Sequence, residues 1–372
     1  KKASASLFEL SEGNYEIRVK AENDGIGYEN SNWSKTIPFE KQYETGCVYE
    51  LINNNTEYEV RGLGSASGDV VIDDYYRGKP VTKIGDMAFA NKSKEIRTVT
   101  LGKYIRTIGS RAFYNCALME GVTLSNSITE IGAYAFQGCR TLTIVTLPKN
   151  LKAISNYMFA YCRSLETVVM PDGLTAIGSY AFSNCDKLNN VVIPNTVKTI
   201  GESAFAACTS LEHVTLSNAV TQLDAYCFAD CTSLKTVSMP DTVETIGYRV
   251  FRNDISLTSV NIPIGWKECP EYSRYYYGHM FEGCSSLTEV IIPEGLVDLP
   301  AYAFQGCNKL EEIVLHDGIT QIPDYAFDGC TSLTGLDLPA LERTLAPLFF
   351  GLSLQDQAHN GCYVQHGNTS CQ

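Results

Sequence analysis

The chain has 372 residues, of which 44% are hydrophobic and 19% are charged, a balance typical of a packed protein and unlike that of a disordered chain. Its formal net charge is −13, and without clusters of Lys and Arg this acidic balance argues against nucleic acid or an anionic membrane as the main partner. No apolar run approaches the roughly 18 residues of a membrane span, and the opening residues KKASASLFEL lack the apolar core of a signal peptide.

The first 43 residues differ from the rest of the chain. Tyr15, Ile17 and Val19 alternate with polar residues and a second alternating stretch comes after them, which predicts two β-strands. Residues 7–39 resemble the last two strands of a fibronectin type III domain, although they are too short for the whole sandwich of seven strands. We therefore assign residues 1–43 to a partial β segment, which is either the end of a larger domain or an adapted cap on the rest of the chain.

The pattern of residues 44–83 predicts a cap at the N-terminal end of a repeat array. Apolar residues alternate on both sides of Asn53-Asn54-Asn55-Thr56, a pattern that indicates a β-hairpin. Val70-Val71-Ile72 then reads as a first stacked strand, and Val81 begins the first full turn. We expect a cap because the open end of a solenoid would expose its core and an unpaired strand edge.

A repeat dominates the chain from residue 84 to residue 352. Phenylalanine recurs every 23 residues, apart from one interval of 24 residues and one of 30. A fixed period of this length is the signature of a solenoid, in which each repeat buries its apolar face only against its neighbours. We count about twelve repeats, whose phenylalanines are Phe89, Phe113, Phe136, Phe159, Phe182, Phe205, Phe228, Phe251, Phe281, Phe304, Phe327 and Phe350.

Each repeat has two parts. The first is L-x-x-V-x-L, as in Leu142, Val145 and Leu147, and it has the period of a short half-buried strand. A proline follows directly in seven repeats, and we expect the strand to end there because proline lacks the N–H group that a ladder needs. The second part is I-G-x-x-A-F-x-x-C, as in Ile131–Cys139, which predicts a tight turn and then a short helical turn that presses the Ala-Phe pair inward.

These motifs closely resemble the BspA-like class of leucine-rich repeats over about residues 44–350. The resemblance implies a repeat solenoid, a right-handed β/α (β/3-10) superhelix with parallel strands on one face. It also implies a secreted or cell-surface bacterial protein that binds a host extracellular-matrix protein or a protein on a neighbouring cell, with a glycan as the alternative ligand. We expect such a chain to be monomeric and to bind no nucleic acid.

The longest interval holds an insertion at residues 266–278, which contains Tyr272, Tyr275, Tyr276 and Tyr277. Tyrosines supply large contact areas at little entropic cost, and insertions in solenoids map to one face. These four residues are therefore candidates for binding a partner. The alternative is a loop that folds back over the neighbouring repeat and buries its own rings.

The solvent-facing strand positions form a stripe at the repeat period. Thr167, Asn190, His213 and Thr215 lie near its centre, and acidic residues lie toward its C-terminal end. Solenoid faces of this kind are common binding surfaces, which makes these residues candidates. However, β-propensity alone would also select Thr and Val there.

A second stripe stands two residues before the phenylalanine and includes Tyr134, Tyr157 and Tyr180. At the repeat period these rings should stack into a ladder on one edge. Structural stacking is one role for such a ladder, and contact with a protein or a glycan is the other.

Fourteen cysteines would ordinarily suggest a disulfide framework or metal sites. Nine of them instead recur three residues after the phenylalanine, whereas a catalytic cysteine would be singular and would have a dedicated base. Cys227 replaces the alanine before Phe228, and Cys269 aligns with an Ile or Leu of other repeats. We therefore predict eleven reduced core cysteines: these two and Cys116, Cys139, Cys162, Cys185, Cys208, Cys231, Cys284, Cys307 and Cys330.

Residues 353–372 form a C-terminal tail with His359, Cys362, His366 and Cys371. The spacing H-x2-C-x3-H-x4-C could hold zinc. A Cys362–Cys371 disulfide that closes a short loop is the second alternative and suits an extracellular protein. The third is a tail with neither.

The sequence contains no nucleotide-binding glycine loop and no H-E-x-x-H or G-x-S-x-G motif, and the remaining histidines form no constellation. We therefore predict a non-enzymatic protein without catalytic residues, cofactor or metal. Its leading function is adhesion or recognition, and the alternative is a structural spacer in a larger multidomain surface protein. An enzyme or metal site in the insertion or the tail comes third.

Overall fold

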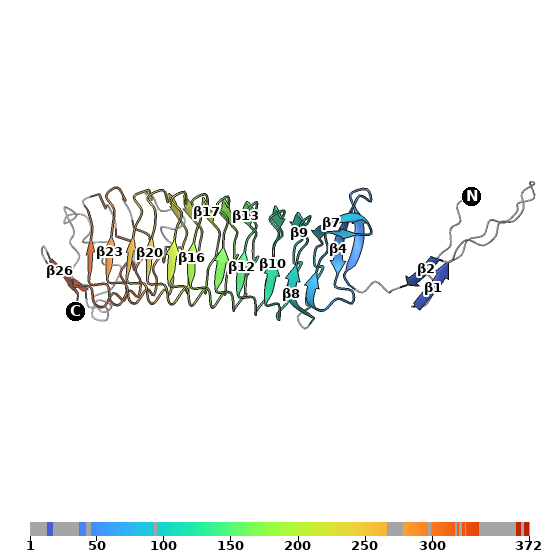
Figure 1. Ribbon diagram of the computed structural model, residues 1–372. Helices are drawn as coiled ribbons and strands as arrows, with labels where there is room; N and C mark the ends of the chain where they lie inside the picture. The colour runs from blue at the N-terminus through green and yellow to red at the C-terminus, as the bar shows by residue number, and fades with distance from the viewer. Residues whose placement is uncertain are drawn as a thin grey trace, which may run out of the picture.

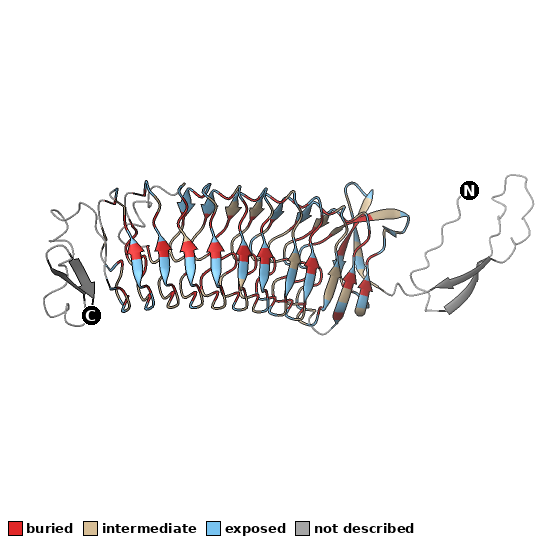
Figure 2. Cartoon of the chain, turned by 60° about the vertical axis from the view of Figure 1, so that its left-hand side comes forward, coloured by how far each residue is buried: buried red, intermediate tan, exposed pale blue. Residues whose placement is uncertain are grey.

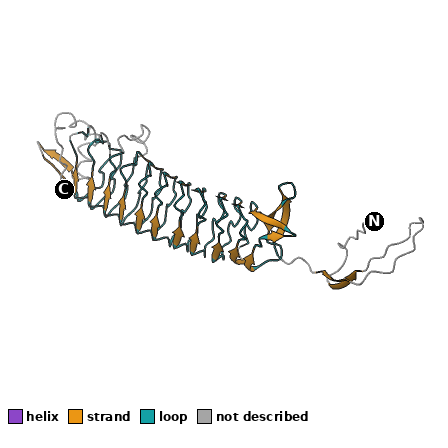
Figure 3. Ribbon diagram, turned by 45° about the horizontal axis from the view of Figure 1, so that its top comes forward, coloured by secondary structure: helices purple, strands orange, loops and turns teal. Residues whose placement is uncertain are grey.

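The chain folds into an elongated stack of coils (Figure 1). In the described residues the secondary structure consists of strands and turns without a helix (Figure 3). The computed structural model describes residues 13–17, 37–41, 46–92, 95–265, 278–296, 299–316, 318–319, 322–323, 325–334, 362–365 and 368–371.

One row of parallel strands runs along the array, one strand from each coil (Figure 1). Successive strands pair in register one repeat apart, so that Val191 lies opposite Val214 and Val214 opposite Val237. The predicted solenoid of parallel strands is therefore confirmed. The row consists of β5 (Gly68–Val71), β8 (Ile96–Thr100), β10 (Gly121–Thr123), β12 (Ile144–Thr146), β14 (Thr167–Val169), β16 (Asn190–Val192), β18 (His213–Thr215), β20 (Thr236–Ser238), β22 (Ser259–Asn261), β23 (Glu289–Ile291) and β24 (Glu312–Val314).

A second row of short parallel strands lies at the I-G motif of each repeat. The second residue of these strands is buried, as Ile131 and Ile154 are, while the first residue of both strands faces outward. These strands hold the coils together on a second side. They are β9 (Thr107–Ile108), β11 (Glu130–Ile131), β13 (Ala153–Ile154), β15 (Ala176–Ile177), β17 (Thr199–Ile200), β19 (Gln222–Leu223) and β21 (Thr245–Ile246).

The core is a column of phenylalanine rings, one from each coil. Eleven rings from Phe89 to Phe327 stack in succession, with centroid separations between 5.0 and 5.7 Å. The stack continues across the insertion, where Phe251 and Phe281 lie 5.5 Å apart with ring planes 2° from parallel. Because every coil supplies the same side chain at the same point, the core continues without a break from Phe251 to Phe281. The twelfth phenylalanine, Phe350, lies outside the described residues.

The helical turn that we expected at the Ala-Phe pair is replaced by non-helical turns in the described coils. Residues two before and two after the phenylalanine have a positive φ, such as 61° at Tyr134 and 76° at Gly138. The N–H group of Phe136 donates to the carbonyl of Met158 in the next coil at 2.9 Å, whereas that of Cys139 donates within its own coil to Phe136. A helix would keep all of these bonds within the segment. Hydrogen bonding between coils therefore decides the backbone conformation here.

An antiparallel hairpin covers the N-terminal end of the array. Strands β3 (Val48–Ile52) and β4 (Glu57–Gly62) are joined at Asn53–Thr56, where three consecutive asparagines have positive φ. Strand β4 pairs in parallel with β7 (Lys79–Ile84), which also pairs with β6 (Tyr75–Tyr76). The hairpin thus continues the sheet of the first coil, and its role as a cap remains a prediction.

Two further hairpins lie near the ends of the chain. Strand β1 (Gly13–Ile17) pairs with β2 (Ile37–Lys41), and β25 (Cys362–Gln365) pairs with β26 (Asn368–Cys371), both in antiparallel register. The pairing of β1 with β2 agrees with two strands in this segment, and the fibronectin-like resemblance remains a prediction.

Candidate binding surfaces

The long strands present one continuous face to solvent. In most of them the central residue is buried while the first and third residues are exposed, and Figure 2 shows most of these strands coloured partly as exposed and partly as buried. The candidates Thr167, Asn190, His213 and Thr215 all lie exposed on this face, and Asn190 lies directly opposite His213 in the register. We call this row of exposed positions the sheet face.

Aliphatic side chains interrupt the polar character of the sheet face at three places, of which Val71 on β5, 62% exposed, is the most N-terminal. Near its centre are Val169 and Val192, which are 50% and 70% exposed, together with Ile144 on the preceding strand. Near its C-terminal end Ile291 lies opposite Val314. Branched aliphatic side chains that are exposed to solvent can bury apolar surface area when a partner binds. We call these the central patch (Ile144, Val169 and Val192) and the C-terminal patch (Ile291 and Val314).

The tyrosine stripe forms a stacked column on another edge of the coils. The rings of Tyr134 and Tyr157 lie 4.6 Å apart, as do those of Tyr157 and Tyr180, and the guanidinium of Arg111 lies 4.6 Å from the ring of Tyr134. Neighbours therefore cover both faces of Tyr134 and Tyr157. What this column offers to a partner is ring edges and hydroxyl groups, of which that of Tyr180 donates to Glu202.

The four tyrosines of the insertion, Tyr272, Tyr275, Tyr276 and Tyr277, lie outside the described residues. The glycines beside them are described. A Cβ on Gly278 would come within 1.8 Å of the carbonyl oxygen of Ala301, and a Cβ on Gly265 within 2.2 Å of that of Asp241. The chain therefore passes close against neighbouring backbone on both sides of the insertion, at positions that only glycine fits.

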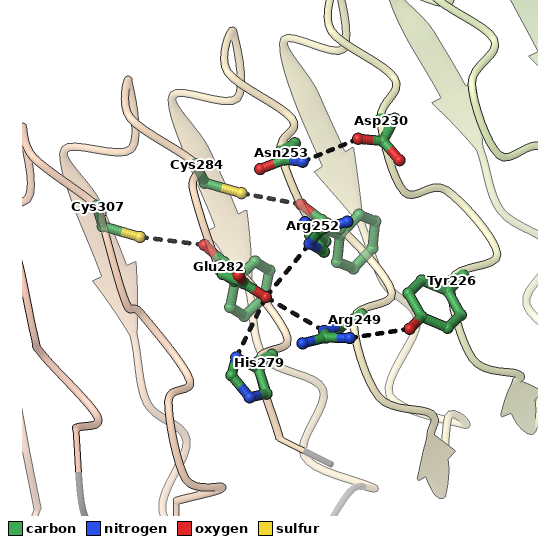
Figure 4. Close-up of polar contacts among 11 residues, drawn as sticks. Tyr226, Asp230, Arg249, Arg252, Asn253, His279, Glu282, Cys284 and Cys307 are labelled. Atoms are coloured by element: carbon green, nitrogen blue, oxygen red, sulfur yellow. Dashed lines mark hydrogen bonds and ion pairs between the residues drawn. The ribbon is translucent and has the colours of Figure 1, made fainter. Parts of the chain in front are cut away.

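Next to the insertion, an arginine and a histidine take over the tyrosine position. Arg249 and His279 stand two residues before Phe251 and Phe281, where other coils carry tyrosine. Figure 4 shows that both side chains converge on the carboxylate of Glu282: Nε of Arg249 and Nδ1 of His279 each lie 3.2 Å from it. The sequence alone does not reveal this cluster, because the longer interval hides that the two residues occupy equivalent positions.

The cluster has two further contacts that link it to the rest of the edge. Nε of Arg252 lies 3.3 Å from Glu282, and Arg249 donates to the hydroxyl of Tyr226 at 3.0 Å. The imidazole of His279 stacks on Tyr302 at 4.3 Å. Burial lowers the pKa of His279, which the carboxylate of Glu282 opposes. The cluster therefore stabilises the coils on both sides of the insertion.

A second charged cluster fastens the cap to the array. Glu57 accepts hydrogen bonds from Arg106 at 2.6 Å and from Thr82 at 2.8 Å, and Arg106 is the main cause of its lowered pKa. The buried Glu59 lies 2.9 Å from Arg61 and 3.1 Å from Lys83. Apart from Arg61, these groups line a hollow of about 300 Å³, where both carboxylates lie against cations of the protein itself.

The cysteines that follow the phenylalanines form a buried ladder. Each thiol donates to the carbonyl oxygen of the phenylalanine in the preceding coil, at distances from 3.0 to 3.3 Å, as Cys284 does to Phe251 (Figure 4). Burial raises the pKa of the Cys162 thiol to about 12. A thiol that does not ionise is a poor nucleophile, so the ladder is a structural feature.

The comparisons with known proteins agree with this geometry. The family model of the BspA type leucine rich repeat region matches in six copies, over residues 77–174, 152–277 and 270–356, which is well over half of the chain. The chain belongs to this family. No curated protein sequence matches the BspA-type chain at a significant level.

Solved structures similar to this chain come from several bacteria. A leucine-rich repeat protein from Bacteroides ovatus is 28% identical, with a TM-score of 0.63 and coverage of 79% of this chain and 81% of that one. A leucine rich cell surface protein from Faecalibacterium prausnitzii is 27% identical, with a TM-score of 0.46 and coverage of 80% and 94%. The pneumococcal vaccine antigen PcpA shares the fold at 16% identity, with a TM-score of 0.51 and coverage of 80% and 86%.

Two further properties of this BspA-type chain concern metals and membranes. Among the described residues, His, Cys, Asp and Glu form no group of three that could hold a metal ion. None of the described segments is a helix long and apolar enough to cross a membrane. His359 and His366 lie outside the described residues, while the register of β25 and β26 places Cys362 directly opposite Cys371.

Proposed function

We propose that this chain is a non-enzymatic recognition module of a bacterial cell surface or secretome, and that it binds a partner protein through the sheet face. The observation that carries this proposal is the exposure of aliphatic side chains within an otherwise polar, regular surface, above all Val192 at 70%. Isolated exposed aliphatics are ordinary, but here they share one flat face and lie on neighbouring coils.

The rigidity of the array supports this role. The stacked phenylalanines, the thiol ladder and two rows of parallel strands fix the spacing of the exposed residues from coil to coil. A surface that is ordered before binding loses little conformational entropy when a partner arrives. Repeat arrays in general use such extended surfaces for recognition.

A protein suits the sheet face better than the alternative ligands do. Sugar rings bind by stacking on aromatic faces, yet the faces of Tyr134 and Tyr157 are covered by neighbouring side chains. The net charge of −13 disfavours nucleic acid. Aliphatic patches flanked by threonine, asparagine and glutamate match the mixed composition of a protein interface.

Surface plasmon resonance against a panel of extracellular-matrix proteins tests the proposal. The variants are Val192→Glu in the central patch and Ile291→Glu in the C-terminal patch, and the matched control is Met87→Glu, a similarly exposed apolar residue at the tyrosine-column position. We expect saturable binding that at least one sheet-face variant weakens roughly tenfold or more, with the control unchanged. Absence of saturable binding would favour the spacer function, and equal affinity of all variants would exclude the sheet face.

A further inference from the structure

The thiol ladder has one interruption, at Asp254. This residue stands three positions after Phe251, where nine other coils carry cysteine, and it is fully buried. Its neighbours in the ladder are Cys231 in the preceding coil and Cys284 in the following one, both fully buried. A carboxyl group thus occupies a position that the rest of the array reserves for a small thiol.

Two hydrogen-bonding groups are left incomplete at this point. From Phe89 to Phe304, Phe228 is the one phenylalanine of the column whose carbonyl receives no thiol among the described residues, because its donor would come from position 254. The Oδ1 atom of Asp254 accepts the N–H group of Cys231 at 2.8 Å, while Oδ2 has no hydrogen-bond partner in the described part of the chain. The carbonyl of Phe228, which accepts the N–H group of Cys231 at 3.3 Å but no thiol, and the unpaired oxygen of Asp254 therefore belong to the same rung of the ladder.

We infer that Asp254 is a neutral carboxylic acid in the folded protein, and that its Oδ2–H group replaces the cysteine thiol as the donor to the carbonyl of Phe228. One proton on Oδ2 then gives this oxygen a hydrogen-bond partner and gives the carbonyl of Phe228 a second donor. The carboxyl keeps Oδ1 as the acceptor for Cys231, so one side chain joins the coils of Phe228 and Phe251 in both directions.

The groups that face Asp254 favour the neutral form. From the preceding coil these are Asp230, Cys227 and Cys231, and from the following coil Cys284; none of them carries a positive charge. The nearby guanidinium of Arg252 lies against Glu282 instead. Burial raises the pKa of Asp254 well above its usual value, and the carboxylate of Asp230 adds to this effect.

This arrangement makes the joint between the two coils sensitive to pH. In the unfolded chain Asp254 ionises near its ordinary pKa of about 4, whereas in the folded chain it keeps its proton to a higher pH. Between the two pKa values the folded state binds one proton more than the unfolded state, so its stability falls as pH rises. Since coils stabilise only their neighbours, we expect this joint to open before the rest of the array.

Two measurements on the full chain test the inference. Infrared difference spectra of wild type against Asp254→Asn should show the carbonyl band of a protonated carboxyl at neutral pH, and its absence would overturn the inference. The second measurement compares urea unfolding of wild type and Asp254→Cys, which restores the ladder, from pH 5 to pH 8.

We expect the folded-to-unfolded ratio of wild type, relative to Asp254→Cys, to fall as pH rises from 5, by roughly tenfold per pH unit as long as Asp254 keeps its proton in the folded state. A ratio that stays constant or rises with pH would contradict a neutral Asp254. Asp254→Cys keeps this test usable even where Asp254→Asn does not fold, because cysteine is the residue that the equivalent positions of nine other coils accept.

Discussion

The ladder cysteines stabilise the array through two properties of one small side chain. Each fills a fully buried position, and each supplies a donor to a phenylalanine carbonyl in the preceding coil. Alanine would fill most of the volume without the donor. The repetition of cysteine over nine coils thus has a structural reason that does not involve disulfides or metals.

The raised thiol pKa values predict a loss of stability at alkaline pH. Cys162 has a pKa of about 12 in the folded protein, compared with about 8.5 in an unfolded chain. The contribution of the protonated Cys162 thiol to stability is therefore complete below about pH 8.5. As pH rises from there toward 12, the free energy of unfolding falls by about 1.4 kcal/mol per pH unit because of this thiol.

The measurement is the free energy of unfolding in urea between pH 8 and pH 10.5, for wild type and for Cys162→Ser, which cannot ionise in this range. Above about pH 8.5, the free energy of unfolding of wild type should fall relative to that of Cys162→Ser by about 1.4 kcal/mol per pH unit. A difference that is independent of pH would show that Cys162 ionises equally in both states.

At the scale of the turn, positive φ values give a further prediction. Ala207 has a φ of 58° at a position where Gly138, Gly283, Gly306 and Gly329 stand in other coils. Ala207→Gly should therefore stabilise the protein by about 1 kcal/mol, since an alanine Cβ is strained in this conformation. The neighbouring Ala206→Gly is the control and should cost about 0.5–1 kcal/mol. Thermal unfolding of both variants decides the matter, and a lower Tm for Ala207→Gly would count against the turn geometry.

The junction of the insertion with the array depends on Gly278. Its replacement by alanine would push a Cβ into the carbonyl oxygen of Ala301, at 1.8 Å. We expect Gly278→Ala to lower the free energy of unfolding by about 2–3 kcal/mol or more. Gly121→Ala is the matched control, because a Cβ there meets no atom within 4 Å. Equal stability of the two variants in urea unfolding would disprove the close approach.

Among the alternatives for the tail, the register of the C-terminal hairpin favours a Cys362–Cys371 disulfide. Directly opposed residues of antiparallel strands have Cα atoms about 4.5–5.5 Å apart, which is within disulfide reach. We expect mass spectrometry of a non-reduced digest to find the Cys362–Cys371 link in protein prepared under oxidising conditions. Free thiols at both positions, or zinc bound in a stoichiometric amount, would refute it.

At the scale of the whole molecule, the repeat made the fold predictable. Phe136 and Val145 recur in equivalent places in coil after coil, so one interpretation of their environment applies to the whole array. The same logic placed the sheet-face residues, such as Thr167, on the exposed side of the strands. Periodicity is informative because stacked identical coils must bury identical residues.

Features without a period could not be predicted in this way. The positive φ of Tyr134 is imposed by hydrogen bonds to the next coil, whereas residue preferences alone favour a negative φ. Arg249 and His279 meet at Glu282 across a long interval that conceals their equivalence. Asp254 stands at the periodic cysteine position, but an aspartate there gives no sign in the sequence that it is buried.

Binding of a partner to the sheet face can be observed by oxidative footprinting of the complex with a protein found in the binding panel. Hydroxyl radicals modify exposed aliphatic and aromatic side chains, so free and bound protein can be compared residue by residue. We predict that Val169 and Val192, or Ile291 and Val314, are protected in the complex while Tyr134, Tyr157 and Tyr180 keep their reactivity. Protection of the tyrosine column with an unchanged sheet face would contradict the account.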